Sequence, residues 1–274
     1  MKRQNILKKG IFIFFFFIAV YHSKAQDTSS LAVTEHQILA KYLGIFTVNP
    51  MDRESKAEKF FDEFYEATSC DSSFYYPFLL LDKIGKIYSP DHKLRIYSWN
   101  IPIGIDDNLY YCIIQYYSKH NKKYISVKLH DTHKPTQKIT LSEWPGVLYY
   151  QIADTKNSGQ YFYTILGFNM NNLLSNKKVI DVISINDDDV VSFCSKLIEY
   201  KKGYVDRLVF EYNEKANMML RYDERNQMIV FDHLSPQKPS LEGNYQFYGP
   251  DFSYDGLRFE NGVWKYYSNI DVKN

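Results

Sequence analysis

Apolar residues recur with a helical period in the first part of the chain, between residues 26 and 84. After Asp52, a residue type that often caps helices, they are spaced so that they share one helix face. These apolar residues are Ala57, Phe60, Phe61, Phe64 and Tyr65. An earlier helix is expected to begin at Ser29 or Ser30 and to end at Gly44. The continuous apolar stretch 74–81 predicts a third, short and buried helix.

From residue 85 onward, short apolar segments alternate with polar turns, which is the pattern of β-strands. The expected strands are 86–88, 94–99, 109–117, 124–129, 147–152, 160–166, 208–212, 218–222, 228–231, 257–259 and 263–267. Their connections are mostly short, which favours antiparallel neighbours because a parallel pair needs a long crossover. Asn261-Gly262 favours the positive φ angles of a type I′ hairpin turn. The acidic run 186–189 predicts a cap for a helix over 190–200.

These patterns predict a mainly β protein with a small α-helical N-terminal segment. We expect a signal peptide over residues 1–25, the helical segment over 26–84 and an antiparallel β-rich domain, a β meander, over 85–274. The alternative is an incomplete or irregular β-propeller. Ser89-Pro90-Asp91-His92 resembles a turn of propeller blades, although His92 stands where glycine is expected, and 249–252 is a poorer copy. A propeller needs four or more similar blades.

The first 25 residues have the three parts of a secretory signal peptide. Basic residues come first, an unbroken apolar run follows over 11–20, and Ser23 and Ala25 supply small residues before Gln26. The apolar run is too short to cross a hydrocarbon core of about 30 Å as a helix. We therefore expect an exported protein, periplasmic or extracellular, that begins at Gln26 and has no membrane span once the signal is removed.

Charge argues against some partners. Five of the 33 basic residues lie in the signal and none of the 32 acidic residues does, so 28 basic against 32 acidic residues leave a net charge of −4. Such a chain lacks the basic footprint that nucleic acids and anionic membrane surfaces require. The three cysteines, Cys70, Cys112 and Cys194, allow at most one internal disulfide. Cys112 lies in an apolar strand and is expected to be buried.

Three segments together resemble a group of secreted, functionally uncharacterised proteins common in Bacteroidetes. They are residues 89–99, residues 229–234, and residues 249–256 with Gly262-Val263-Trp264. The signal ending, Lys24-Ala25-Gln26, fits the same group, and the resemblance covers most of residues 85–274. It implies export to the bacterial envelope, but no activity and no catalytic residue.

Two segments are candidate metal sites. His130 and His133, three residues apart beside Asp131, are suited to sharing a metal, although a solvated loop explains the same residues. Asp251, Ser253 and Asp255 with Gly256 match the opening of a calcium loop. Residue 262, where that loop needs a bidentate glutamate, is glycine, so we expect an Asp-stabilised turn without any cofactor, and calcium is the alternative.

The expected function is non-enzymatic: binding or interaction with an envelope protein, a glycan or a peptide. Trp99, Trp144 and Trp264 are the candidate ligand contacts, and Trp144, before Pro145-Gly146, is the one expected to be exposed. The alternative is a secreted hydrolase acting on polysaccharide, peptide or envelope lipid. Asp232-His233 has the composition of a base and its orienting partner, but no nucleophile accompanies it. The chain contains none of the common nucleophile-elbow, zinc-protease or nucleotide-binding motifs.

Overall fold

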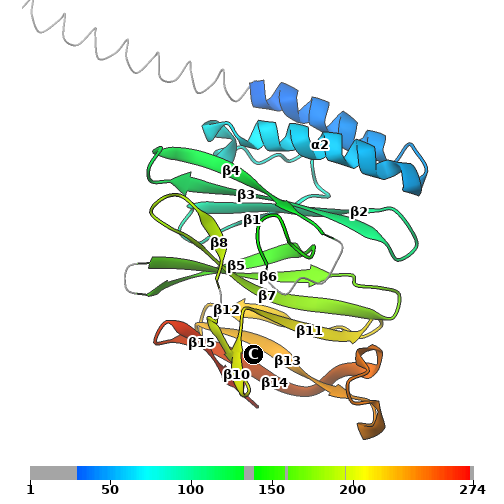
Figure 1. Ribbon diagram of the computed structural model, residues 1–274, viewed down its shortest axis with the longest axis vertical. Helices are drawn as coiled ribbons and strands as arrows, with labels where there is room; N and C mark the ends of the chain where they lie inside the picture. The colour runs from blue at the N-terminus through cyan, green and yellow to red at the C-terminus, as the bar shows by residue number, and fades with distance from the viewer. Residues whose placement is uncertain (1–29, 133–138, 158–159, 195, 272–274) are drawn as a thin grey trace, which may run out of the picture.

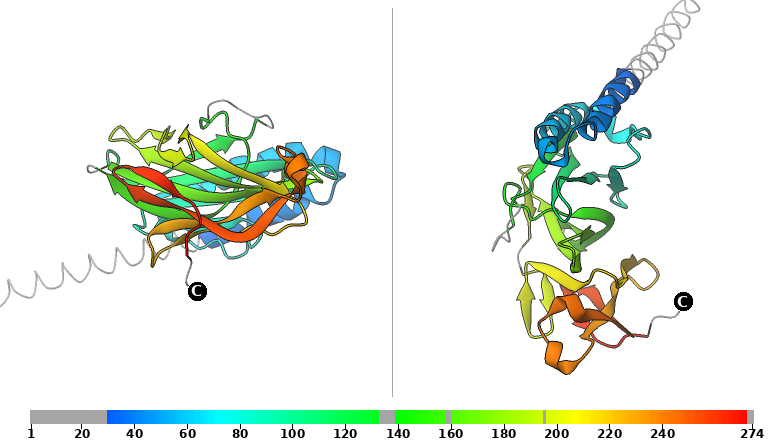
Figure 2. Two further views of the ribbon diagram at one scale, coloured as in Figure 1. Left: turned by 90° about the horizontal axis from the view of Figure 1, so that it is seen from below. Right: turned by 90° about the vertical axis from the view of Figure 1, so that its right-hand side faces the viewer.

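The computed structural model describes residues 30–132, 139–157, 160–194 and 196–271. The chain is stacked in layers, in which the helices cover a first β-sheet and second and third sheets follow beneath it (Figure 1). Figure 2 shows the same stack from the side. Each interface between layers has its own hydrophobic core. The prediction of a mainly β protein with a helical N-terminal segment is confirmed, and residues 1–25 lie outside the described residues.

The helical layer consists of a helix over residues 30–45 and of α2 (Arg53–Thr68), with the 3-10 turn η1 (Pro50–Asp52) before α2. The predicted apolar face of α2 is buried against the first sheet, so the helical period read from the sequence is confirmed. Asp52 occupies the N-cap position, but its side chain makes no capping hydrogen bond. Packing of the apolar face, rather than the cap, therefore holds this helix in place.

The predicted helix over 74–81 is wrong. A 3-10 turn, η2 (Asp71–Tyr75), ends before Pro77, and the residue preceding that proline is extended, as steric clash with the proline ring requires. The buried Arg95 guanidinium donates from Nη1 to three backbone carbonyls of this stretch, at 2.7 to 3.2 Å. A helix would need such carbonyls for its own hydrogen bonds.

The first sheet is an antiparallel meander in chain order. It consists of β1 (Gly85–Tyr88), β2 (Leu94–Pro102), β3 (Asn108–Ser118) and β4 (Lys123–His130). Alternate residues face opposite sides, as in any strand. Tyr97 and Trp99 pack toward the helices, whereas Ile96 and Cys112 pack toward the second sheet. The predicted burial of Cys112 is confirmed, and all three cysteines are free thiols.

The second sheet is buried on both faces. It consists of β5 (Leu148–Asn157), β6 (Gln160–Asn169), β7 (Ser175–Ile185) and β11 (Arg207–Asn213), with β8 (Val191–Phe193) paired to β7. Along β7, Val179 and Ile183 face the first sheet, whereas Ile180 and Val182 face the third. The apolar run of this strand thus contributes side chains to two hydrophobic cores, one on each face of the sheet.

The predicted helix over 190–200 is also wrong, because β8 and β9 (Ile198–Tyr200) occupy this stretch. The acidic run forms a hairpin turn instead of a helix cap. Asp189 has a φ of +61°, and the amide of Val190 donates to Asn186 Oδ1 at 2.8 Å. This turn returns the chain along β7, which gives β8 a strand partner.

The third sheet departs from a simple meander. It consists of β9, β10 (Gly203–Val205), β12 (Leu220–Asp223), β13 (Met228–Pro236), β14 (Tyr248–Glu260) and β15 (Val263–Tyr267). The short turns η3 (Pro239–Leu241) and η4 (Tyr245–Phe247) connect β13 to β14. β15 pairs with β9 in parallel, whereas the other pairs are antiparallel. Asn261 and Gly262, with φ of +53° and +85°, fit the predicted type I′ turn.

The alternative of a β-propeller is wrong, because the sheets stack as layers instead of circling an axis (Figure 1). The Ser89–His92 turn nevertheless has a local reason to resemble a propeller turn. Ser89 donates to Asp91 Oδ1 at 2.6 Å, and His92 adopts the left-handed φ of +54° at the position where glycine was expected. The resemblance is limited to this one turn and does not extend to the arrangement of the strands.

Gly167 on β6 provides a test of the close packing within the second sheet. A Cβ atom at this position would lie 2.1 Å from the Val147 side chain and 3.0 Å from the Tyr149 ring. We expect Gly167→Ala to lower the free energy of unfolding by about 1–3 kcal/mol through overpacking, measured by urea titration. Gly203→Ala, where nothing lies within 4 Å, is the matched control and should change it by less than about 0.5 kcal/mol. Equal effects would contradict the packing described here.

Candidate functional site

A polar pocket opens between the first and second sheets, near the connections that join β2 to β3 and β6 to β7 (right-hand edge of Figure 1). Its volume is about 360 Å³, within the range of about 300–1,000 Å³ that small-molecule sites occupy. It is lined by Asp106, Asp107, Asn108, Tyr110, Asp131, Ile139, Pro145, Gly146, Val147, Asn169, Asn171, Lys177, Val179, Arg207 and Val209. We call this the inter-sheet pocket.

Arg207, the first residue of β11, is held rigidly in the pocket wall. Its Nε and Nη2 donate to the two carboxylate oxygens of Asp181 on β7, both at 2.6 Å. The Asp181 side chain is fully buried, and it also accepts a 2.6 Å hydrogen bond from the Tyr149 hydroxyl. Trp144 Nε1 in turn donates to that hydroxyl at 3.0 Å. A bidentate ion pair with such support fixes the orientation of the guanidinium.

The surroundings of this pair keep Arg207 and Tyr149 each in one protonation state. Burial alone would lower the pKa of the Arg207 guanidinium, but the charge and hydrogen bonds of Asp181, together with Tyr149, outweigh burial and raise it. Burial, reinforced by Asp181, raises the pKa of the Tyr149 hydroxyl well above its usual value. Arg207 is therefore a permanent cation at the pocket wall, and Tyr149 stays a hydrogen-bond donor.

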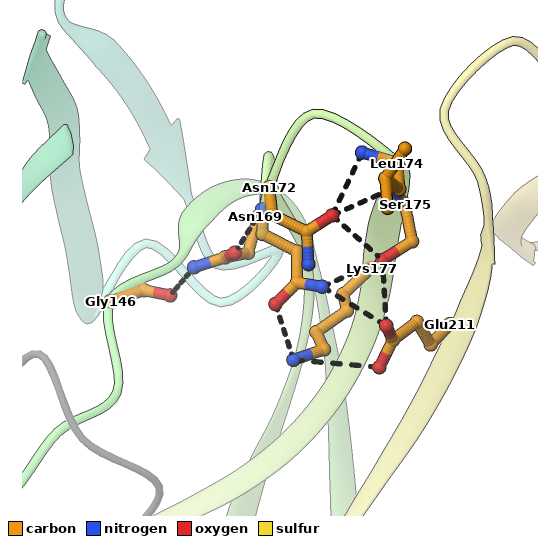
Figure 3. Close-up of polar contacts among 8 residues, drawn as sticks. Gly146, Asn169, Asn172, Leu174, Ser175, Lys177 and Glu211 are labelled. Atoms are coloured by element: carbon orange, nitrogen blue, oxygen red, sulfur yellow. Dashed lines mark hydrogen bonds and ion pairs between the residues drawn. The ribbon is translucent and has the colours of Figure 1, made fainter. Parts of the chain in front are cut away.

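Lys177 on β7 provides the second cation, and the β6–β7 connection holds it in place (Figure 3). Its Nζ donates to Asn171 Oδ1 at 2.6 Å and lies 3.6 Å from Glu211 Oε2 on β11. Asn171 donates from Nδ2 to Glu211 at 3.0 Å, and Ser175 donates to the same carboxylate oxygen at 2.6 Å. This closed network fixes the ammonium before any ligand arrives.

Asn169 and Gly146 join the two sides of the pocket rim. Asn169 Nδ2 donates to the Gly146 carbonyl at 2.7 Å (Figure 3), and the Met170 amide donates to the Tyr110 hydroxyl at 3.0 Å. Gly146 has a φ of +57°, and a Cβ there would lie 2.6 Å from the Tyr110 ring. Both observations require glycine at residue 146, because a side chain would be strained and would clash with Tyr110.

Carboxylates lie on the opposite wall, which belongs to the first sheet. Asp106 and Asp107 are exposed residues of the β2–β3 connection, and Asp131 follows β4. Asp131 Oδ2 accepts a hydrogen bond from the Tyr110 amide at 3.2 Å, which orients this carboxylate. Val147, Val179 and Val209 add apolar side chains to the lining, and the last two pair with each other on the wall of the second sheet. The pocket thus combines fixed charges of both signs with apolar side chains.

The three tryptophans predicted as ligand contacts lie in the cores, one in each interface between layers. Trp144 is fully buried, so the prediction that it is exposed is wrong. The turn that follows it lies between two sheets, where its indole packs. Trp264 Nε1 donates to Thr164 Oγ1 at 2.8 Å, which makes it a structural residue as well. Trp99 stacks on Tyr111 beneath the helices.

Of the four predicted metal residues, the three that the structure describes lie on strands. His130 is exposed at the end of β4, and His133 lies outside the described residues. Asp251 and Asp255 both belong to strand β14 instead of a calcium loop. Asp255 is buried and accepts hydrogen bonds from the Tyr266 hydroxyl and the Asn269 amide. Among the residues that the structure describes, no three His, Cys, Asp or Glu side chains are gathered in a way that would hold a metal.

His233 pairs with Asp251, not with its neighbour Asp232. Its Nδ1 lies 2.8 Å from Asp251 Oδ2, and the Ser253 hydroxyl donates to the other oxygen at 2.7 Å. Partial burial alone would raise the pKa of Asp251, but these hydrogen bonds outweigh it and lower the pKa. The serine bonds to the carboxylate and not to the imidazole, so this cluster lacks the order of a catalytic triad.

Comparisons of the chain with models of protein families, with curated proteins and with solved structures find no match. No helix among the described residues is long and apolar enough to cross a membrane. The functional argument therefore depends on the inter-sheet pocket. Its residues come from four separate parts of the chain and form no motif. Pro145-Gly146 is the sequence signal that lies in the pocket lining, but as a turn signal it points to the exposure of Trp144 and not to a pocket.

Proposed function

We propose that this chain is an exported, non-enzymatic binding protein that takes a small polar ligand into the inter-sheet pocket. The observation that carries this proposal is that Arg207 and Lys177 are already fixed by Asp181, Glu211 and Asn171. Polar groups that are positioned in advance lose little freedom when a ligand binds, which favours affinity. The signal-peptide pattern of residues 1–25 supports the expected export.

A binding role is favoured over a hydrolase because each strongly basic group of the pocket is committed to a structural partner. Arg207 remains charged throughout the physiological range, and the Tyr149 hydroxyl, which supports its partner Asp181, has a pKa far above that range. A general acid or base works best with a pKa near the operating pH. The pKa values of Arg207 and Tyr149 are both raised further above that pH, which makes these two groups unsuited to acid–base catalysis.

The test is a thermal-shift screen of the mature chain with amino acids, dipeptides, sugars, dicarboxylates and diamines. A ligand at 100 times its Kd stabilises the folded protein by about 2.7 kcal/mol and raises Tm. Val209→Trp should abolish that shift. Val209 lies on the edge strand β11, lines the pocket and is 42% exposed, so an indole there fills the cavity without removing a core contact.

Val33→Trp is the matched control, because Val33 is 60% exposed on the helix over 30–45 and does not line the pocket. It should retain the full thermal shift. The proposal fails if no compound stabilises the wild type, or if the shift survives in Val209→Trp. Turnover of a bound peptide or glycan that Asp131→Asn abolishes would instead establish the hydrolase alternative.

A further inference from the structure

The two walls of the inter-sheet pocket present different polar groups. The carboxylates of Asp106, Asp107 and Asp131 come from the first sheet and its connections, whereas Lys177 and Arg207 come from the second. Val179 and Val209, which pair across β7 and β11, lie on the second wall between the two cations. A ligand that bridges the walls therefore meets acceptors at one end and donors at the other.

Both cations have hydrogen-bond donors left over for a ligand. A guanidinium has five N–H groups, and Asp181 accepts one each from Nε and Nη2 of Arg207. Among the described residues nothing accepts from Nη1 of Arg207. An ammonium has three N–H groups, and Asn171 accepts one from Lys177, while Glu211 at 3.6 Å lies beyond hydrogen-bond distance. These remaining donors suit a carboxylate, the partner that Arg and Lys bind most strongly.

The charge balance disfavours a purely anionic ligand. Arg207 and Lys177 are already neutralised by Asp181 and Glu211, so such a ligand would add uncompensated charge near three aspartates. A purely cationic ligand would be attracted to the aspartates but would offer no acceptor to the remaining donors of Arg207 and Lys177. A ligand with separated positive and negative ends suits both walls.

We propose that the ligand is a zwitterion of the size of a free amino acid or a short peptide. Its ammonium lies at the aspartate wall, its carboxylate at Arg207 and Lys177, and its side chain against the valines. The cavity of about 360 Å³ lies near the lower end of the range for small-molecule sites, which fits one to a few residues and not a long chain. This inference rests on the proposed function and specifies its ligand class.

The test is isothermal titration calorimetry of the mature chain with alanyl-leucine, its N-acetylated form, its C-terminal amide, and a neutral disaccharide. The unmodified dipeptide should bind most tightly. Each blocked form should bind at least about tenfold more weakly, the change expected when one charge-assisted hydrogen bond is lost. A panel of free amino acids and further dipeptides covers the choice of side chain.

Two variants assign the ends of the ligand. Asp107→Asn, on an exposed connection, should weaken the free dipeptide about tenfold and leave the acetylated form unchanged. Lys177→Met should weaken the free dipeptide and leave the amide unchanged. If the disaccharide binds and Val209→Trp abolishes its binding while no dipeptide or amino acid binds, the zwitterion is wrong and the binding function stands. If no compound of either class binds, the zwitterion is wrong, and if nothing in the thermal-shift screen binds either, both proposals fail.

Discussion

Replacing Asp181 with asparagine is expected to destabilise the protein by about 3–5 kcal/mol, because it leaves Arg207 buried without a countercharge. The Asp181 side chain is fully buried and the Arg207 side chain is 12% exposed, so water does little to screen the pair. Asparagine keeps the size of the side chain and one acceptor oxygen for the Tyr149 hydroxyl, but its amide nitrogen faces a donor of Arg207, so the loss combines the missing charge with one broken hydrogen bond. Thermal unfolding should show a decrease of Tm on the order of 10 °C.

A double-mutant cycle separates this electrostatic cost from general damage to the core. Asp181→Asn with Arg207→Met buries no charge, so it should recover at least about half of the stability lost in the single variant. Asp187→Asn is the exposed control, since its partner Lys119 and the carboxylate itself lie in solvent, and it should change stability by less than about 1 kcal/mol. An Asp181→Asn variant no less stable than that control would contradict the role assigned to the pair.

The sequence predicted the β architecture well because strands and helices leave different periods in a sequence. The two-sided burial along β3, with Tyr111 and Ile113 on one face and Cys112 on the other, appears in the sequence as the continuous apolar run 109–114. Stacked sheets produce such runs repeatedly, and the run alone does not say which layer each face meets. The stacking order and the parallel β9–β15 pair therefore required the structure.

The two wrong helices have a common cause in tertiary partners that local patterns do not show. Arg95, which lies 19 to 22 residues after the three residues whose carbonyls it binds, takes carbonyls that a helix would have used. β7 supplies the edge on which β8 forms within 190–200. Apolar runs of this length fit a short helix or a strand equally well, and the neighbouring element decides between them.

The candidate site was beyond prediction for a different reason. Asp131, Lys177 and Arg207 are separated by tens of residues, and each is an ordinary charged residue in its own segment. They meet only because the first sheet stacks on the second with their connections on the same side. The tryptophans were predicted as ligand contacts because indoles are frequent at binding surfaces. Each of them is instead buried in one of the three interfaces between layers.

Buried tyrosines are expected to make the protein unfold in alkali. Burial raises the pKa of Tyr116 and of Tyr212 from 10.0 to about 12, and the Asp189 charge adds to the effect at Tyr116. Both side chains are 2% exposed. A tyrosine whose folded pKa is raised contributes stability that is complete below its unfolded pKa of 10.0 and is lost as pH rises through the folded value. The loss should therefore fall between pH 10 and about 12.

The size of this effect follows from proton linkage. Two pKa units correspond to about 3 kcal/mol for each tyrosine. Two such residues together reach the stability of a typical domain, about 5–15 kcal/mol. Urea titrations at successive pH values should show a constant free energy of unfolding up to about pH 9 and a steep decrease above pH 10, accompanied by a cooperative rise in tyrosinate absorbance.

The variant Tyr212→Phe tests whether ionisation of Tyr212 causes the loss of stability at high pH. Tyr212 packs in the core between the second and third sheets, and phenylalanine fills the same space but has no proton to lose. The variant should therefore lose less stability between pH 8 and pH 11 than the wild type, by about 1 kcal/mol or more. Tyr204→Phe, at a 55% exposed tyrosine of β10, is the control and should follow the wild type. Parallel curves for all three proteins would show that ionisation of Tyr212 does not drive the transition.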